Sequence, residues 1–141
     1  MSTIPAIFPE AQPFPRMRLI LVVEYDVDFG VILTQMIKHK TRYRTILATS
    51  AIEALKFARN FKCDLFLLDY QLPEIHGFEL FDRLHSAEGY EETPALFLSG
   101  NTFLERPFTG LTGLETLLQT MRSLLDPESE DSILLSYNGV W

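Results

Sequence analysis

Asp69 is the residue of this sequence best placed to take part in chemistry. It directly follows an uninterrupted apolar run at residues 65–68, and Pro73 and Gly77 come shortly after it. For a carboxylate considered alone, a role in a turn is the more common interpretation. Other residues with suitable oxygen atoms also follow apolar runs, namely Glu24, Tyr25, Asp26 and Ser99. Carboxylates beside a hydroxyl group suit Mg²⁺, which prefers oxygen ligands, and a phosphoryl group, which needs hydrogen-bond donors and positive charge.

These residues must be brought together by the elements around them. Apolar, β-prone segments predict strands over residues 18–24, 43–48, 64–69 and 95–99. Apolar residues at helical spacing predict helices over residues 29–39, after Ser50, over residues 78–84 and over residues 111–125. Strict alternation of strands and helices implies parallel strands joined by right-handed crossovers. The carboxyl ends of the strands then meet at one edge of the sheet, where open α/β sheets place their functional groups.

The two predicted helices on either side of the third predicted strand have apolar faces that can be identified from the sequence. Ser50 caps the first of them, and Glu53 completes a capping box three residues later. The apolar face expected for this helix consists of Ile52, Leu55, Phe57 and Ala58. The face expected for the helix over residues 78–84 consists of Phe78, Leu80, Phe81 and Leu84. The leucine-rich stripe in residues 111–125 is most often core, with a protein interface as the alternative.

Composition limits the classes of protein that this chain can belong to. A length of 141 residues and a hydrophobic content of 47% are typical of one globular domain. The net charge of −7 argues against direct binding to nucleic acid or to an anionic membrane. The single cysteine, Cys63, excludes an intrachain disulfide and a thiolate zinc site, and His39, His76 and His85 lack metal spacing. We therefore expect a soluble cytoplasmic protein, with a Pro-rich arm at residues 1–16 and a tail at residues 126–141.

The chain resembles the receiver domain of two-component response regulators, the CheY-like family, over residues 17–125. The motifs that carry the resemblance occur in the family's order at residues 20–26, 64–77, 94–99 and 103–108. The resemblance implies a flavodoxin-like, doubly wound, parallel five-stranded α/β sheet. It also implies that Asp69 accepts a phosphoryl group from a histidine kinase, and that Ser99 binds a phosphoryl oxygen. Glu24, Asp69 and the main-chain carbonyl of Gln71 would hold Mg²⁺.

The sequence departs from the family pattern at three single positions. Tyr25 stands where the family has a second acid, and an uncharged tyrosine is a poor ligand for Mg²⁺, so we expect weak binding of the metal. Asp26 is a further candidate ligand, but it can replace the missing acid only from the loop. Arg106 replaces the family's lysine and keeps its charge. Phe103 occupies the family's switch-aromatic position without a hydroxyl group.

The largest departure is a deletion. Only residues 100–105 separate Ser99 from Arg106, whereas a helical crossover between parallel strands needs at least about 10–12 residues. The crossover helix between the fourth and fifth strands of the family is therefore missing. In one geometry, residues 103–105 form a very short fifth strand and residues 111–125 the last helix. In the other, residues 111–125 are the crossover and residues 133–137 the last strand. The motifs favour the first geometry.

The sequence leads to two hypotheses about function. The first is a stand-alone, atypical receiver in a phosphorelay, with a sensor histidine kinase or phosphotransfer protein and a downstream protein as partners. The second is a pseudo-receiver, a protein-interaction module that works without phosphorylation. In neither is the chain an enzyme. The family resemblance also implies a cis bond between Arg106 and Pro107, and the missing helix favours a homodimer formed through residues 100–141.

Overall fold

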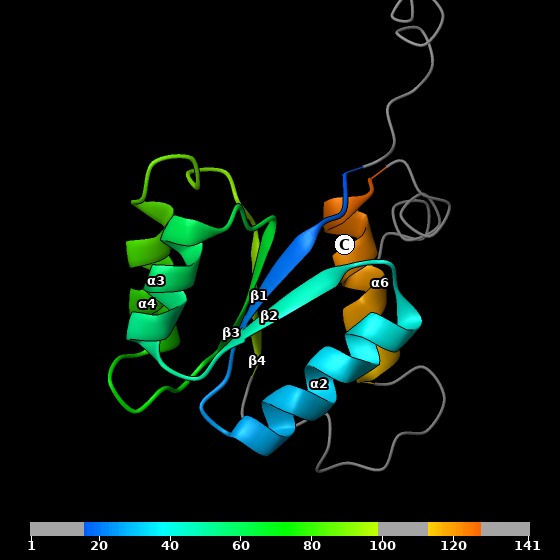
Figure 1. Cartoon of the computed structure of the whole chain (residues 1–141), viewed down its shortest axis with the longest axis horizontal. Helices are drawn as coiled ribbons and strands as arrows, with labels where there is room; N and C mark the ends of the chain where they lie inside the picture. Colours follow the sequence, from blue (N-terminus) through cyan, green and yellow to red (C-terminus); the bar gives the residue numbers. More distant parts are fainter. Residues whose placement is uncertain (1–15, 99–112, 128–141) are drawn as a thin grey trace, which may run out of the picture.

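The computed structural model describes residues 16–98 and 113–127, which form alternating strands and helices (Figure 1). The strands are β1 (Leu19–Val23), β2 (Arg44–Ala48), β3 (Leu65–Asp69) and β4 (Ala95–Leu98). The helices are α2 (Val27–Lys40), α3 (Ala51–Asn60), α4 (Gly77–His85) and α6 (Leu114–Leu125). Every strand and helix predicted within these residues is therefore present, with small shifts at its ends. The predicted arm, apart from Arg16, and most of the predicted tail lie outside the described residues.

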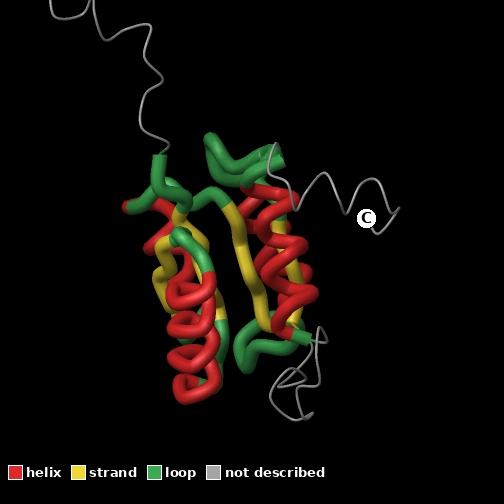
Figure 2. Tube along the Cα trace, turned by 90° about the vertical axis from the view of Figure 1, so that its right-hand side faces the viewer, coloured by secondary structure: helices red, strands yellow, loops and turns green. Residues whose placement is uncertain are grey.

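The four described strands form one parallel sheet in the order β2-β1-β3-β4. Val23, the last residue of β1, pairs with Ala48 of β2 on one side and with Leu68 of β3 on the other. The carboxyl ends of these strands are therefore level with one another. Helices α2 and α6 cover one face of the sheet, and α3 and α4 cover the other (Figures 1 and 2). The doubly wound α/β fold is confirmed, while the candidates for a fifth strand lie outside the described residues.

The buried strands supply side chains to both helical layers. On β1, Ile20 and Val22 contact the core under α2 and α6, whereas Leu21 and Val23 contact the core under α3 and α4. All five residues of β3 are buried. This alternation is the reason why both strands read as continuous apolar runs in the sequence.

The expected apolar faces of α3 and α4 were wrong in part. Ser50 does cap α3, by accepting a hydrogen bond from the amide of Glu53 at 3.1 Å. However, α3 buries its alanines Ala51, Ala54 and Ala58, and Ile52 is 71% exposed. Small side chains allow the helix to approach the sheet closely, and this leaves the larger residues at the edge of the contact. In α4, Leu80 and Leu84 are fully buried as expected, but Phe78 is 49% exposed.

Helix α6 packs into the core beside α2, although it is distant from α2 in the sequence. Its buried residues are Leu114, Leu117, Leu118, Met121, Ser123 and Leu125. The hydroxyl of Tyr43 donates to Asp126 at 2.6 Å, and Arg122 donates to the carbonyl of Lys40 at 3.0 Å. The predicted leucine stripe is therefore mainly core in this chain, and within residues 113–127 Leu124 is its one exposed leucine.

The position of α6 bears on the two predicted geometries for the end of the chain. The crossovers from β2 to β3 and from β3 to β4 run through α3 and α4, on the face opposite α6. A right-handed crossover from β4 to a strand beside it would lie on that same face. Helix α6 lies on the other face and does not occupy that position, which favours the first geometry. No helix in the described ranges is long and apolar enough to span a membrane.

Candidate functional site

Two carboxylates lie side by side at the carboxyl edge of the sheet. Asp69 is the last residue of β3, and Glu24 directly follows β1, the neighbouring strand. Because Val23 pairs with Leu68, the next residues of the two strands, Glu24 and Asp69, are also neighbours. Both are buried, with exposed fractions of 2% for Glu24 and 6% for Asp69. The sequence therefore correctly predicted that the sheet brings these two acids together.

The electrostatics of Glu24 are unusual for a carboxyl group. Burial, together with a hydrogen bond and charge repulsion from Asp69, raises the pKa of Glu24 to about 8. The amide of Asp26, which donates to Oε2 of Glu24 at 3.0 Å, opposes part of this rise. Oε1 of Glu24 is buried and has no hydrogen-bond partner among the described residues. Glu24 therefore holds a proton at neutral pH, and one of its buried oxygen atoms is available to a ligand.

The raised pKa of Glu24 predicts how stability changes with pH. The unfolded chain releases this proton near the ordinary pKa of 4.5, but the folded chain keeps it up to about 8. The folded state thus binds more protons in this window, so its stability should fall as the pH rises through it. Denaturant unfolding near pH 5 and near pH 8 measures how far the free energy of unfolding falls between the two. In Glu24→Gln this fall should be smaller than in the parent, by roughly 1–3 kcal/mol. Equal falls in the parent and in Glu24→Gln would contradict this, and the exposed Glu88→Gln variant is the matched control.

The loop after β3 is held against the site by backbone contacts. The amide of Gln71 donates to Oδ1 of Asp69 at 3.1 Å, and the amide of Gly77 donates to the carbonyl of Tyr70 at 2.8 Å. The Gln71 carbonyl, a predicted metal ligand, takes no part in either bond. A Cβ atom on Gly77 would lie 2.5 Å from the carbonyl oxygen of Asp69, so only glycine fits there. The sequence indicated a turn near Gly77, but it could not reveal how closely Gly77 approaches the carbonyl oxygen of Asp69.

His76 also has a structural role that the sequence did not indicate. It is exposed, but its Nδ1 accepts a hydrogen bond from the amide of Phe78 at 3.1 Å and so caps α4. The Nε2 atom of His85 lies 2.7 Å from the carbonyl oxygen of Thr93. Neither histidine belongs to the carboxylate pair.

The residues after Glu24 do not supply a third buried carboxylate. The side chain of Tyr25 is 60% exposed. Oδ1 of Asp26 accepts a hydrogen bond from the amide of Phe29 at 3.1 Å and caps α2. Among the described residues there is accordingly no group of three or more acidic, histidine or cysteine side chains that could hold a metal ion. Ser99, Phe103 and Arg106, the other predicted site residues, lie outside the described residues, as does the bond between Arg106 and Pro107.

Comparison with known proteins identifies the family. A family model described as the response regulator receiver domain matches residues 20–122. The chain belongs to this family. Receiver domains act in two-component signalling, interact with kinases or phosphotransfer proteins, and generally bind Mg²⁺ at their phosphorylation site. Glu24 and Asp69 fit such an ion in part, because they offer hard oxygen ligands and one buried oxygen that has no partner in the described part of the chain.

Two curated relatives are response regulators. The polar-differentiation response regulator DivK of Brucella ovis is 34% identical over 77 residues, which cover 55% of this chain and 62% of DivK. The corresponding protein of Brucella anthropi is 31% identical over 77 residues, with the same coverage. The match thus spans less than two thirds of the length of these relatives.

Solved receiver structures are similar over more of the chain. The chemotaxis protein CheY4 of Vibrio cholerae has a TM-score of 0.64 and 23% identity, and the match covers 78% of this chain and 100% of CheY4. The HemR receiver domain of Leptospira biflexa has a TM-score of 0.60 and 26% identity, with 77% and 94% of the two chains covered. The likeness to CheY4 supports the receiver fold.

Proposed function

We propose that this receiver domain takes part in phosphorelay signalling by accepting a phosphoryl group on Asp69. The donor would be a sensor histidine kinase or a phosphotransfer protein. The observation that carries the proposal is the buried pair of Glu24 and Asp69 at the carboxyl edge of the sheet, with one buried Glu24 oxygen lacking a partner among the described residues. A carboxylate oxygen of Asp69 would attack the phosphorus atom and form an acyl phosphate, while the histidine nitrogen of the donor leaves with the bonding electrons.

Each neighbouring residue has a role in this proposal. Glu24, Asp69 and the carbonyl of Gln71 would hold Mg²⁺, whose positive charge offsets the charge of the phosphoryl oxygens. The amide of Gln71 already donates to Asp69 and holds its carboxylate in place. From the sequence, Ser99 would donate to a phosphoryl oxygen, and Arg106 would supply positive charge beside it. Because Glu24 is protonated at neutral pH, binding of Mg²⁺ would release a proton.

Phosphorylation can be tested with a small phosphodonor. We expect incubation with acetyl phosphate and Mg²⁺ to add one phosphoryl group to the parent chain, as measured by intact mass. Asp69→Asn should gain none, because an amide is not a competent acceptor. Asp82→Asn is the matched control, since Asp82 is an exposed carboxylate on α4. A gain of phosphoryl mass in Asp69→Asn, or no such gain in the parent, would contradict the proposal.

A pseudo-receiver is the second candidate, and the residues after Glu24 favour it. Tyr25 is largely exposed, and Asp26 is engaged in capping α2, so the site has fewer acids than the family pattern. In that case the parent chain would bind Mg²⁺ weakly and gain no mass, and the domain would act through protein contacts alone. The same experiment on Tyr25→Asp separates the two candidates. Restored Mg²⁺ binding and labelling in Tyr25→Asp would place the defect at Tyr25.

The proposal includes a downstream protein partner, a cytoplasmic location and a homodimer. The predicted dimer region, residues 100–141, lies mostly outside the described residues. Within it, α6 buries most of its apolar stripe in its own core. A dimer would therefore have to use other parts of this region.

A further inference from the structure

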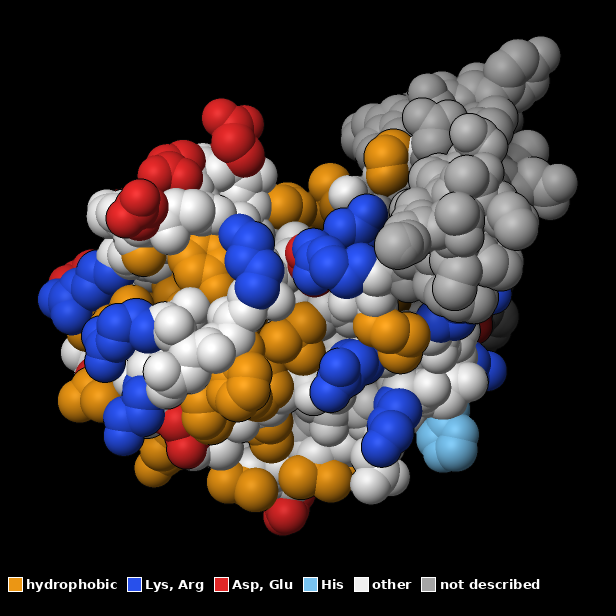
Figure 3. Space-filling view, turned by 45° about the horizontal axis from the view of Figure 1, so that its top comes forward, with side chains coloured by type: hydrophobic (Ala, Val, Ile, Leu, Met, Phe, Trp, Pro, Cys, Tyr) orange, Lys and Arg blue, Asp and Glu red, His pale blue; other side chains and the backbone are white. Residues whose placement is uncertain are grey.

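Positive charge gathers at the end of the molecule opposite Asp69. The chain has 12 Lys and Arg residues and a net charge of −7. More than half of these cations lie at or near the amino ends of β1 and β2 and the adjoining ends of α2 and α6, namely Arg16, Arg18, Lys38, Lys40, Arg42, Arg44 and Arg122. In Figure 3, blue side chains run down the middle and right of this face, where only small areas of red carboxylate are visible. This end is thus locally basic in an acidic protein.

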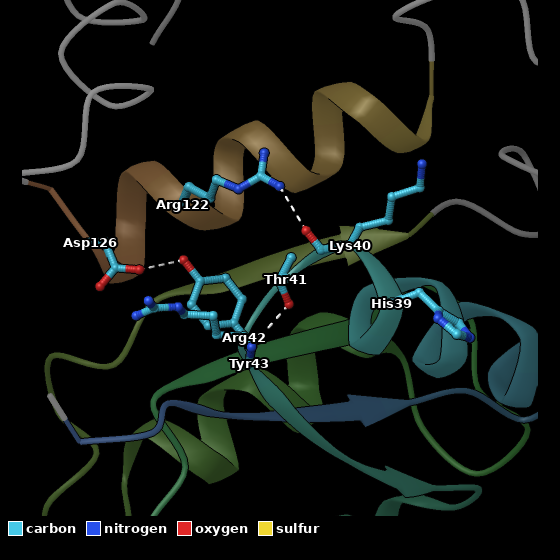
Figure 4. Close-up of a pocket in the computed structure, with 7 residues that line it drawn as sticks. All are labelled: His39, Lys40, Thr41, Arg42, Tyr43, Arg122 and Asp126. Atoms are coloured by element: carbon cyan, nitrogen blue, oxygen red, sulfur yellow. Dashed lines mark hydrogen bonds between the residues drawn. The ribbon is translucent and has the colours of Figure 1, made fainter. Parts of the chain in front are cut away.

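Two adjoining cavities hollow this basic surface. One, of about 320 Å³, is lined by residues that include Lys40, Arg42 and Arg122 (Figure 4). The other, of about 440 Å³, is lined by residues that include Lys38 and Arg44. The two cavities share Thr41, Arg42 and Tyr43 and therefore lie next to each other along this segment; we call the pair the basic groove.

The cations of the basic groove differ in how far they are already engaged. Arg122 donates to the carbonyl of Lys40, and the carboxylate of Asp126 accepts from the hydroxyl of Tyr43 (Figure 4). Lys38, Lys40, Arg42 and Arg44 are exposed, and their side chains form no ion pair with any other described residue. Their charges are therefore available to a ligand.

Individual cations of the basic groove have local structural roles, but these roles do not explain why the cations gather around the groove. Lys38 and Lys40 lie in the last turn of α2, where positive charge interacts favourably with the helix dipole. Arg44 begins β2, an edge strand of the described sheet, and charged residues on an edge oppose unwanted pairing. Neither role requires cations from α2, β2 and α6 to gather around two adjoining cavities.

The arrangement of these cations indicates the shape of the ligand. Arg42 and Arg44 are exposed and lie on either side of the buried Tyr43, where the chain enters β2 (Arg44–Ala48). Two residues of strand span about 6.6 Å, so the two cations are separated by a distance of this order, which is also the spacing of carboxylates at every second position of an extended peptide. A single phosphate is too small to reach cations distributed along both cavities. We propose that the basic groove binds an extended, carboxylate-rich segment of a protein partner.

This proposal is independent of phosphorylation at Asp69 and can be tested by fluorescence anisotropy. A fluorescein-labelled oligoglutamate peptide would be titrated with the full chain at low salt. We expect saturable binding that weakens with added salt, and no binding of an oligoglutamine peptide. The double variant Arg42→Glu/Arg44→Glu should bind about tenfold more weakly. The matched control is Lys56→Glu/Arg59→Glu, which makes the same charge change at exposed positions on α3 and should leave binding nearly unchanged.

Each alternative outcome has a definite meaning. Equal weakening in both double variants would overturn the proposal, because it would show attraction to the net charge alone. Saturable binding of inorganic pyrophosphate without peptide binding would assign the groove to a small phosphate compound instead. Peptide binding seen only after deletion of residues 128–141 would assign the basic groove to the chain's own tail. Circular dichroism monitors folding, and Arg42→Gln/Arg44→Gln replaces the charge-reversal variant if that variant does not fold.

Discussion

Replacement of Leu118 with alanine is expected to lower the free energy of unfolding by about 2–5 kcal/mol. Leu118 is fully buried in the middle of α6 and belongs to the same core cluster as Ile20 and Leu67 of the sheet. The truncation removes buried apolar contacts and leaves a cavity that the surrounding strands can fill only in part. Denaturant unfolding followed by circular dichroism measures the change.

Leu124→Ala is the matched control for this experiment. Leu124 is on the same helix, but its side chain is 36% exposed and it does not belong to either core cluster. Its replacement should cost less than about 1 kcal/mol. If the two variants were equally stable, α6 would not be part of the core, and its assignment as an integral helix of the fold would be wrong.

Gly77→Ala is expected to destabilise the chain by roughly 1–3 kcal/mol and to reduce labelling by acetyl phosphate. The new Cβ atom would lie 2.5 Å from the carbonyl oxygen of Asp69 and 3.0 Å from that of Tyr70. Both are backbone atoms, so relief of the clash requires the loop after β3 to move. That movement would disturb the contact between the Gln71 amide and the carboxylate of Asp69.

Gly30→Ala provides the comparison, because it also adds a Cβ atom in a tight space. Here the nearest atoms, at 2.8 and 3.0 Å, are the two terminal methyl groups of Leu47, which can rotate away. Alanine also favours helix over glycine by about 1 kcal/mol, and Gly30 lies inside α2. We therefore expect the free energy of unfolding of Gly30→Ala to stay within about 1 kcal/mol of the parent value. A larger loss in Gly30→Ala than in Gly77→Ala would contradict the proposed role of Gly77.

The sequence predicted the elements and the carboxylate pair because both depend on local patterns. The apolar run before Asp69 and the capping pair of Ser50 and Glu53 are each readable within a few residues. Parallel strands then place Glu24 and Asp69 at the same edge of the sheet, and the strand order of the structure makes them neighbours. Such features do not depend on how closely a helix approaches the sheet.

Other features depend on tertiary packing, and the sequence did not reveal them. Ile52 is as apolar as any core residue, yet α3 approaches the sheet through its alanines and leaves Ile52 exposed. Asp26 was expected to be a candidate ligand, but its side chain caps α2, a role open to any short acid before a helix. The raised pKa of Glu24 follows from its burial beside Asp69, and no local pattern measures burial.

The contacts of α6 also have a consequence for the order of folding. The bonds from Tyr43 to Asp126 and from Arg122 to Lys40 join residues 83 and 82 positions apart. Contacts so distant along the chain require closure of a long loop, which is entropically more costly than the contacts within each βαβ unit. We therefore expect the strands and helices of residues 19–98 to assemble first, with α6 docking late. The carboxylate pair would then form early, and the basic groove only when the last helix has docked.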